Sequence, residues 1–68
     1  MRDYSNSEIA NIIDEHIHSD RDRLILKLRL IDGWTYERIA CDKRIEMSPK
    51  RISYIVSVCC ARIEKYLQ

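Results

Sequence analysis

The sequence predicts an all-α domain, a small four-helix bundle, on the basis of three observations. Apolar residues recur at spacings of three and four within four segments, which is the period of helices with one buried face. Residues that favour helix starts precede each segment. The 68 residues include only one Gly and one Pro and are 46% hydrophobic, a composition typical of a packed domain. We therefore expect a single domain over residues 1–68.

The first two helices are expected over residues 5–18 and 19–32. Ser5 and Glu8 match the S-x-x-E capping box, and a stripe of isoleucines comes after them at helical spacing. The second helix has acidic residues in its first turn, where the helix dipole favours them, and Gly33 ends it. Leucines and isoleucines cover a wide arc of this helix, which predicts that it lies at the centre of the core.

The third and fourth helices are expected over residues 35–45 and 48–67. Thr35 is a natural N-cap for the third helix, whose short apolar face begins directly after it. Ser48 caps the fourth helix, and Pro49 occupies its first position, where a missing N–H costs nothing. Apolar residues keep helical spacing from there almost to the C-terminus.

The charged residues are unevenly distributed along the chain. The net charge is +1, which argues against a general nucleic-acid coat. Residues 1–32 carry five basic and seven acidic side chains, a net charge of −2, whereas residues 33–68 carry seven basic and four acidic ones, a net charge of +3. A polyanion would therefore meet the second half of the chain.

Several function classes are disfavoured by what the sequence lacks. The three cysteines, Cys41, Cys59 and Cys60, are odd in number, and two are adjacent, so we expect reduced packing thiols and no disulfide framework. Their spacing to the histidines does not match a zinc site.

Paired carboxylates, an activated nucleophile and a glycine-rich phosphate loop are missing, so we expect no enzyme and no cofactor. Without a membrane span or signal peptide, we expect a cytoplasmic protein.

The third and fourth helices with their link have the layout of a helix-turn-helix unit. Ala40 is small where the two helices would meet, Met47 would plug the turn, and Ile52 would anchor the second helix. The solvent face of that second helix is polar and basic, as required of a helix that reads base edges. Its residues are Lys50, Arg51, Ser53, Tyr54 and Ser57.

The stretch from Arg21 to Ile63 resembles region four of bacterial sigma factors and the sigma-like regulators of bacteria and phages. The matching pieces are an R-x-x-I-L-x-L-R segment with its first Arg displaced, the G-x-T-Y-E-x-I-A segment over 33–40, and the Met47-Ser48 turn. The resemblance implies that the last helix enters the major groove and that the protein acts in a bacterial cell, encoded by the bacterium or by a phage. It implies DNA contacts from Thr35, Tyr36, Arg38, Ser48, Lys50, Arg51, Ser53, Tyr54 and Ser57, with Thr35, Tyr36 and Arg38 on the phosphate backbone.

The chain departs from this family in the turn. Seven residues separate Ala40 from Ser48, where the family usually has five, and Glu46 replaces the turn glycine. Extending a helix by two residues rotates the next segment of the chain by roughly 200°. Either the third helix is therefore longer or the turn is looped out.

Different interpretations of the same residues remain open. Lys50 and Arg51 are alternatively ordinary solvated charges. Trp34 would seal the core between the second and third helices, or it would anchor a partner chain. In the second functional hypothesis, the bundle is a protein-binding module that docks on RNA polymerase or a host defence factor and inhibits or redirects it. An exposed apolar patch around Trp34, Tyr36 or Tyr66 would favour that hypothesis, and a basic face would favour double-stranded DNA.

A single small module commonly gains affinity for DNA by dimerising on paired half-sites. The segment from Cys59 to Leu67 is the natural place for such contacts. The sequence thus predicts a homodimer formed through the C-terminal helix.

Overall fold

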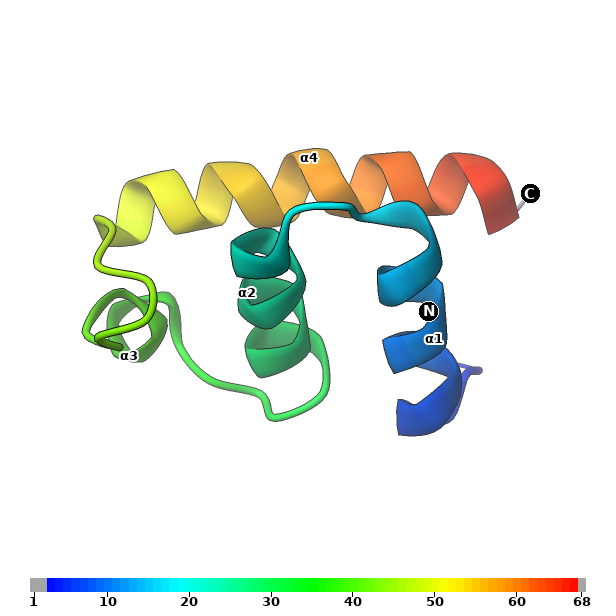
Figure 1. The fold of residues 1–68 in the computed structure, drawn as a ribbon, viewed down its shortest axis with the longest axis horizontal. Helices are drawn as coiled ribbons and strands as arrows, with labels where there is room; N and C mark the ends of the chain where they lie inside the picture. Colours follow the sequence, from blue (N-terminus) through cyan, green and yellow to red (C-terminus); the bar gives the residue numbers. More distant parts are fainter. Residues whose placement is uncertain (1–2, 68) are drawn as a thin grey trace.

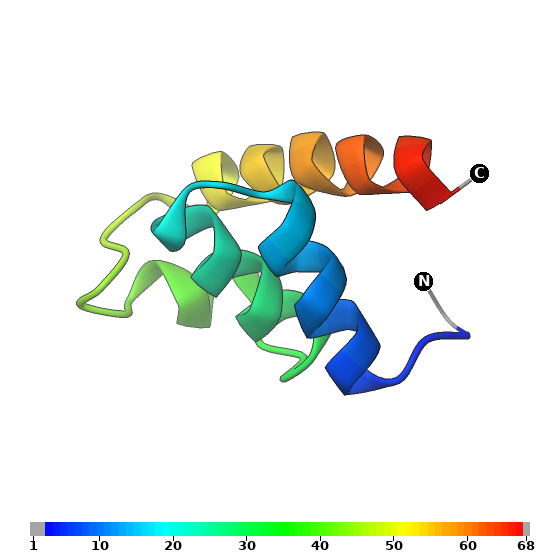
Figure 2. The ribbon, with the colours of Figure 1, turned by 45° about the vertical axis from the view of Figure 1, so that its right-hand side comes forward.

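The computed structural model describes residues 3–67, and this part of the chain contains four helices and no strand. The helices are α1 (Asn6–His16), α2 (Asp20–Leu30), α3 (Tyr36–Ala40) and α4 (Pro49–Leu67). The long α4 lies along one side of the molecule, and α1 and α2 run crosswise to it (Figure 1). Turning the molecule shows α1, α2 and α3 together below α4 (Figure 2). The predicted all-α class is confirmed.

Hydroxyl side chains cap the start of every helix. The oxygens of Ser5, Ser19, Thr35 and Ser48 each accept a hydrogen bond from the backbone N–H three residues later, at 3.1–3.4 Å. At α1 the capping box is complete, because the backbone N–H of Ser5 donates to the Glu8 carboxylate at 3.1 Å. These bonds satisfy N–H groups that have no partner within the helix, and they place all four starts within a residue of those predicted.

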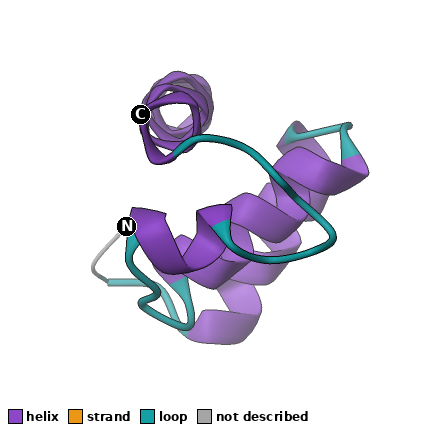
Figure 3. Cartoon of the chain, turned by 90° about the vertical axis from the view of Figure 1, so that its left-hand side faces the viewer, coloured by secondary structure: helices purple, strands orange, loops and turns teal. Residues whose placement is uncertain are grey.

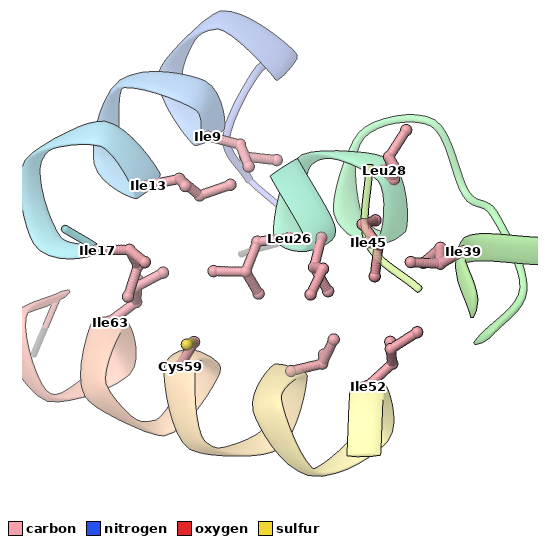
Figure 4. Packing of buried hydrophobic residues seen from close by; sticks show 12 residues of the cluster. Ile9, Ile13, Ile17, Leu26, Leu28, Ile39, Ile45, Ile52, Cys59 and Ile63 are labelled. Carbon is pink, nitrogen blue, oxygen red and sulfur yellow. The ribbon is translucent and has the colours of Figure 1, made fainter. Parts of the chain in front are cut away.

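The core is an aliphatic cluster to which all four helices contribute. Ile13 of α1, Ile25 and Leu26 of α2, and Ile52 and Ile63 of α4 are completely buried. Figure 4 shows the cluster filling the space between α4 and the other helices. Helix α2 contacts each of the other three helices, so its predicted central position is confirmed.

Charged groups on α2 fasten α1 in place. The Arg23 guanidinium donates to the backbone carbonyls of Ile17 and, at 2.8 Å, of Asp14. The ammonium of Lys27 lies 2.9 Å from the Asp14 carboxylate. The hydrogen bond from Lys27 lowers the pKa of Asp14, so this carboxylate stays ionised beside its two basic partners.

Helix α3 is shorter than predicted, which corrects the expected span of 35–45. It ends at Ala40, and the chain then turns at Asp42. The Asp42 carbonyl accepts hydrogen bonds from the N–H groups of Ile45 and Glu46, each at 3.0 Å, so the backbone closes a turn instead of adding helical residues. The two additional residues are thus looped out. Figure 3, a view nearly along α4, shows this loop crossing between α3 and the start of α4.

Ile45 anchors the loop between α3 and α4, a role that the sequence analysis gave to Met47. The Ile45 side chain is only 4% exposed and belongs to the core cluster, whereas Met47 is half-buried at its edge. Glu46 between them has a φ of 49°, which lies in the left-handed region that favours glycine. With this backbone conformation Ile45 is buried in the core and Glu46 is exposed to solvent.

All three cysteines are free. Cys59 is buried in the core and Cys60 is half-buried, and burial raises the pKa of both thiols. A raised pKa keeps them protonated near neutral pH, as expected for packing thiols. Over residues 3–67, no helix is both long and apolar enough to cross a membrane, and no cluster of three metal-ligating side chains forms.

Candidate nucleic-acid interface

The start of α4 presents a cluster of polar and basic side chains to solvent. Ser48, Lys50, Arg51 and Tyr54 together line an open hollow of about 400 Å³. Lys50 and Arg51 are exposed, and 69% of the Tyr54 surface is accessible. These four residues are referred to below as the α4 cluster. All four were among the residues predicted from the sequence to contact DNA.

Helical periodicity places Lys50 and Tyr54 of this cluster opposite the core. Ile52 and Val56 are buried on one face of α4, at a spacing of four residues. Lys50 and Tyr54, two residues out of phase with them, therefore lie about 160–200° around the helix from Ile52. Packing of the buried stripe fixes the orientation of α4 and thereby directs these two side chains outward. Arg51 lies about 100° from Ile52, at the side of the helix.

The charges at the start of α4 differ from those of the other helices. An acidic residue lies in the first turn of α1, α2 and α3, where the helix dipole favours it, but the first turn of α4 has none. Lys50 and Arg51 occupy these positions instead, and neither forms an ion pair within the described part of the chain. Pro49 has no N–H, and the N–H groups of Arg51 and Ile52 are bonded to Ser48. The two cations, and not the backbone, therefore favour a bound anion here.

The remaining predicted residues of α4 are less uniformly placed. Ser57 is exposed one turn beyond Tyr54, so it extends the same outer face. Ser53 is half-buried and lies toward the side of the helix. Only Ser57 therefore adds a fully accessible polar group to the α4 cluster.

The predicted residues of α3 have distinct environments. Thr35 is exposed, and its hydroxyl oxygen accepts a hydrogen bond from the Arg38 N–H at 3.1 Å. The Arg38 guanidinium is exposed and lies 4.1 Å from the centre of the Trp34 ring. Tyr36 is half-buried, with the Arg29 guanidinium 4.3 Å from the centre of its ring. Thr35 and Arg38 are thus accessible to a ligand, whereas the Tyr36 ring is engaged within the protein.

Two features of this region were missed by sequence reasoning. Arg29 of α2 connects to the link before α3, since its Nη1 donates to the Trp34 carbonyl at 2.9 Å. Arg44 forms a double hydrogen bond with the Asp42 carboxylate, at 2.9 and 2.7 Å, so one cation of the basic half of the chain is neutralised. The two-residue spacing of Asp42 and Arg44 was visible in the sequence, but their pairing depends on the turn.

Apolar side chains are also exposed on α4. Val58 is 42% and Tyr66 is 64% accessible. The Tyr66 ring stacks on His16 of α1, with ring centres 4.5 Å apart and planes within 12°. Trp34 and Tyr36 do not form an exposed apolar patch, because both are half-buried and a guanidinium covers each ring.

No protein-family model matches the chain, and comparisons with curated proteins and with solved structures likewise found no match. The geometry of the α4 cluster and of α3 is therefore the basis for a functional interpretation.

Proposed function

We propose that the protein is a sequence-specific DNA-binding transcriptional regulator of bacterial or phage type, in which α3, the loop and α4 form a helix-turn-helix resembling that of sigma region four. The observation that carries this proposal is the α4 cluster. Two cations without an ion-pair partner in the described residues, a hydroxyl and a tyrosine are exposed around one hollow at the start of the longest helix. Such a face suits the edge of a base pair and the phosphates beside it.

The dimensions of a helix suit this role. An α-helix with side chains is about 10–12 Å across and fits the major groove, which is about 12 Å wide. Arg51 would donate two hydrogen bonds to guanine O6 and N7, and Lys50 would reach a neighbouring base or phosphate. Ser48, Tyr54 and Ser57 supply hydroxyls along the same face, and Ser53 contributes from its side.

Helix α3 would hold the DNA backbone. Thr35 and Arg38 are exposed at its start and can donate hydrogen bonds to phosphate oxygens. Tyr36 contributes less, because its ring packs under Arg29. Phosphate contacts of this kind position a protein on the duplex, while the α4 cluster provides the sequence preference.

The second hypothesis, a module that docks on RNA polymerase or a host defence factor, draws support from the exposed apolar residues of α4. Tyr54 and Val58 lie next to each other on its outer face, one turn apart. Tyr66, the third aromatic residue named for such a patch, is 64% exposed and also supports this hypothesis. The same helix carries four basic residues and one acidic residue, however, and the rings of Trp34 and Tyr36 are covered. The balance of these features favours DNA as the partner.

Selection from random DNA duplexes by the purified protein at about 0.15 M salt tests the proposal, because this ionic strength screens weak surface attraction. The double variant Lys50→Ala/Arg51→Ala is run in parallel. The control is Arg21→Ala, which removes a positive charge from an exposed position in the first turn of α2, outside both the α4 cluster and the segment expected to form the dimer. We expect an enriched motif that is lost in the first variant and retained in the second.

The other outcomes of the selection are equally informative. Loss of Arg51 alone should weaken binding to the enriched motif by ~1–3 kcal/mol if it contacts a guanine. A palindromic motif with half-sites about ten base pairs apart would support the homodimer through the C-terminal helix. Absence of any enriched motif from a folded protein would contradict DNA reading and favour a protein partner.

A further inference from the structure

We propose that Trp34 positions the Arg38 guanidinium for contact with a backbone phosphate of duplex DNA. The inference rests on the proposed function and deepens it, since it assigns a DNA-binding task to a residue outside the helix that reads bases. The Arg38 Cζ lies 4.1 Å from the centre of the Trp34 ring. At this distance the positive guanidinium is attracted to the negative face of the indole.

The indole is a restrained platform because it is partly buried against the core cluster and the backbone of Trp34 is held at both of its polar groups. Its N–H donates to the Leu28 carbonyl of α2 at 3.0 Å, and its carbonyl accepts from Arg29 at 2.9 Å. The same Arg29 guanidinium lies over the Tyr36 ring, 4.3 Å from its centre. Residues of α2 thus hold the Trp34 backbone by two hydrogen bonds and also contact the ring of Tyr36, two residues later in the chain.

Arg38 is in turn restrained at two points. Its backbone N–H donates to the Thr35 hydroxyl at 3.1 Å, and its guanidinium lies over the indole. No carboxylate within the described residues pairs with it, and the side chain is exposed. A ring engages the flat face of a guanidinium, so the N–H donors at its edge remain free for the two oxygens of a phosphate.

Holding a long side chain in place before binding reduces the entropy that binding costs. An arginine without the indole would keep its charge but would sample many rotamers. The structural alternative is that the stack only stabilises the link between α2 and α3. The two possibilities differ in whether the effect of Trp34 on DNA affinity requires Arg38.

The experiment is a double-mutant cycle on the affinity of the full chain for a short fluorescein-labelled duplex of mixed sequence at low salt. We expect Trp34→Leu to weaken binding about two- to fivefold, the size of an exposed cation–π contact. Arg38→Ala should weaken binding at least as much and reduce the salt slope by about one, as for one lost phosphate contact. The double variant should bind no more weakly than Arg38→Ala alone.

Trp34 is the only tryptophan of the chain, so its own fluorescence gives a second readout. Emission of the unaltered protein should change when the unlabelled duplex is added. In Arg38→Ala this response should be reduced, because the group that joins the indole to the DNA is missing. Arg38→Lys should restore it only in part, since a lysine ammonium is attracted to the indole but lacks the flat stacking face and the forked N–H donors.

Arg21→Ala is the control for loss of one positive charge, because Arg21 is exposed in the first turn of α2, at the end opposite the Trp34 link. Circular dichroism establishes that each variant is helical, and Trp34→Met, which also lacks a ring, takes the place of Trp34→Leu if the latter does not fold. If a folded Trp34 variant binds DNA like the unaltered protein, the inference is overturned but the proposed function is not. The same holds if removing Trp34 weakens binding equally in the Arg38→Ala protein and in the unaltered protein. Failure of the unaltered protein to bind any duplex would overturn the proposed function as well.

Discussion

Asp42 illustrates how one turn residue organises the approach to the candidate interface. Its carboxylate accepts hydrogen bonds from the Arg44 side chain and, at 2.8 Å, from the Arg44 backbone N–H. These bonds lower the pKa of Asp42 from 3.8 to about 2. Because the folded pKa is the lower one, this interaction contributes its full stability above about pH 4 and loses it as the pH falls towards 2.

The prediction at this scale concerns Asp42→Asn. The substitution should lower the melting temperature at neutral pH, and the difference from the unaltered protein should shrink as the pH falls from about 4 to about 2. Thermal denaturation followed by circular dichroism across this range measures the difference. Asp32→Asn is the control, since Asp32 is exposed and forms no ion pair within residues 3–67. A difference independent of pH would show that the Arg44 pairing is not the source of the effect.

The loop between α3 and α4 acts as a structural element in its own right. Its backbone turn at Asp42 and the left-handed Glu46 bring Ile45 into the core with Ile39 and Ile52, as Figure 4 shows. Because Ile39 belongs to α3 and Ile52 to α4, Ile45 joins the two helices that would form the DNA-binding unit. Ile45 thus adds to the direct packing of α3 against α4 that sets their relative orientation.

We predict that Ile45→Ala lowers the free energy of unfolding by about 2–4 kcal/mol, as for deletion of a core isoleucine. Met47→Ala, at the edge of the cluster, should cost only about 1 kcal/mol, because its side chain remains partly in water. Urea denaturation followed by circular dichroism gives both values. If Met47→Ala lowered the free energy of unfolding as much as Ile45→Ala or more, Met47 would be the residue that anchors the turn, as the sequence predicted.

At the scale of the whole molecule, charge is separated more than the net value of +1 suggests. In the acidic first half of the chain, Asp14 of α1 forms ion pairs with Arg23 and Lys27 of α2. The basic residues of α4 remain unpaired within the described part of the chain, while Arg44 is neutralised by Asp42. Most of the exposed cations without an ion pair in the described residues therefore belong to α3, the loop and α4, and Arg21 of α2 is the exception.

This distribution predicts a shallow salt dependence for DNA binding. With two to four phosphate contacts, the slope of log K against log salt should lie between about −2 and −4, at ~0.9 per contact. Titrations of the enriched duplex at several salt concentrations measure this slope. A slope near zero would contradict binding through phosphate contacts, and one steeper than about −6 would require cations from the acidic half of the chain.

The sequence by itself determined the helical class, the four helix starts and the buried face of each helix. These features arise from local chemistry: a hydroxyl satisfies the first N–H groups of a helix, and apolar side chains at its period must leave water. Lys50, Arg51 and Tyr54 could be placed on the outer face of α4 for the same reason, since Ile52 and Val56 define its inner face.

Only the tertiary structure decided where α3 ends, how the two additional residues are accommodated and which cations remain free. The end at Ala40 depends on the turn at Asp42 and on the burial of Ile45 against residues distant in the sequence. The guanidinium stacks of Arg29 and Arg38 likewise join α2, α3 and the link between them. Such contacts depend on how the helices pack, which the periodicity of each helix alone does not specify.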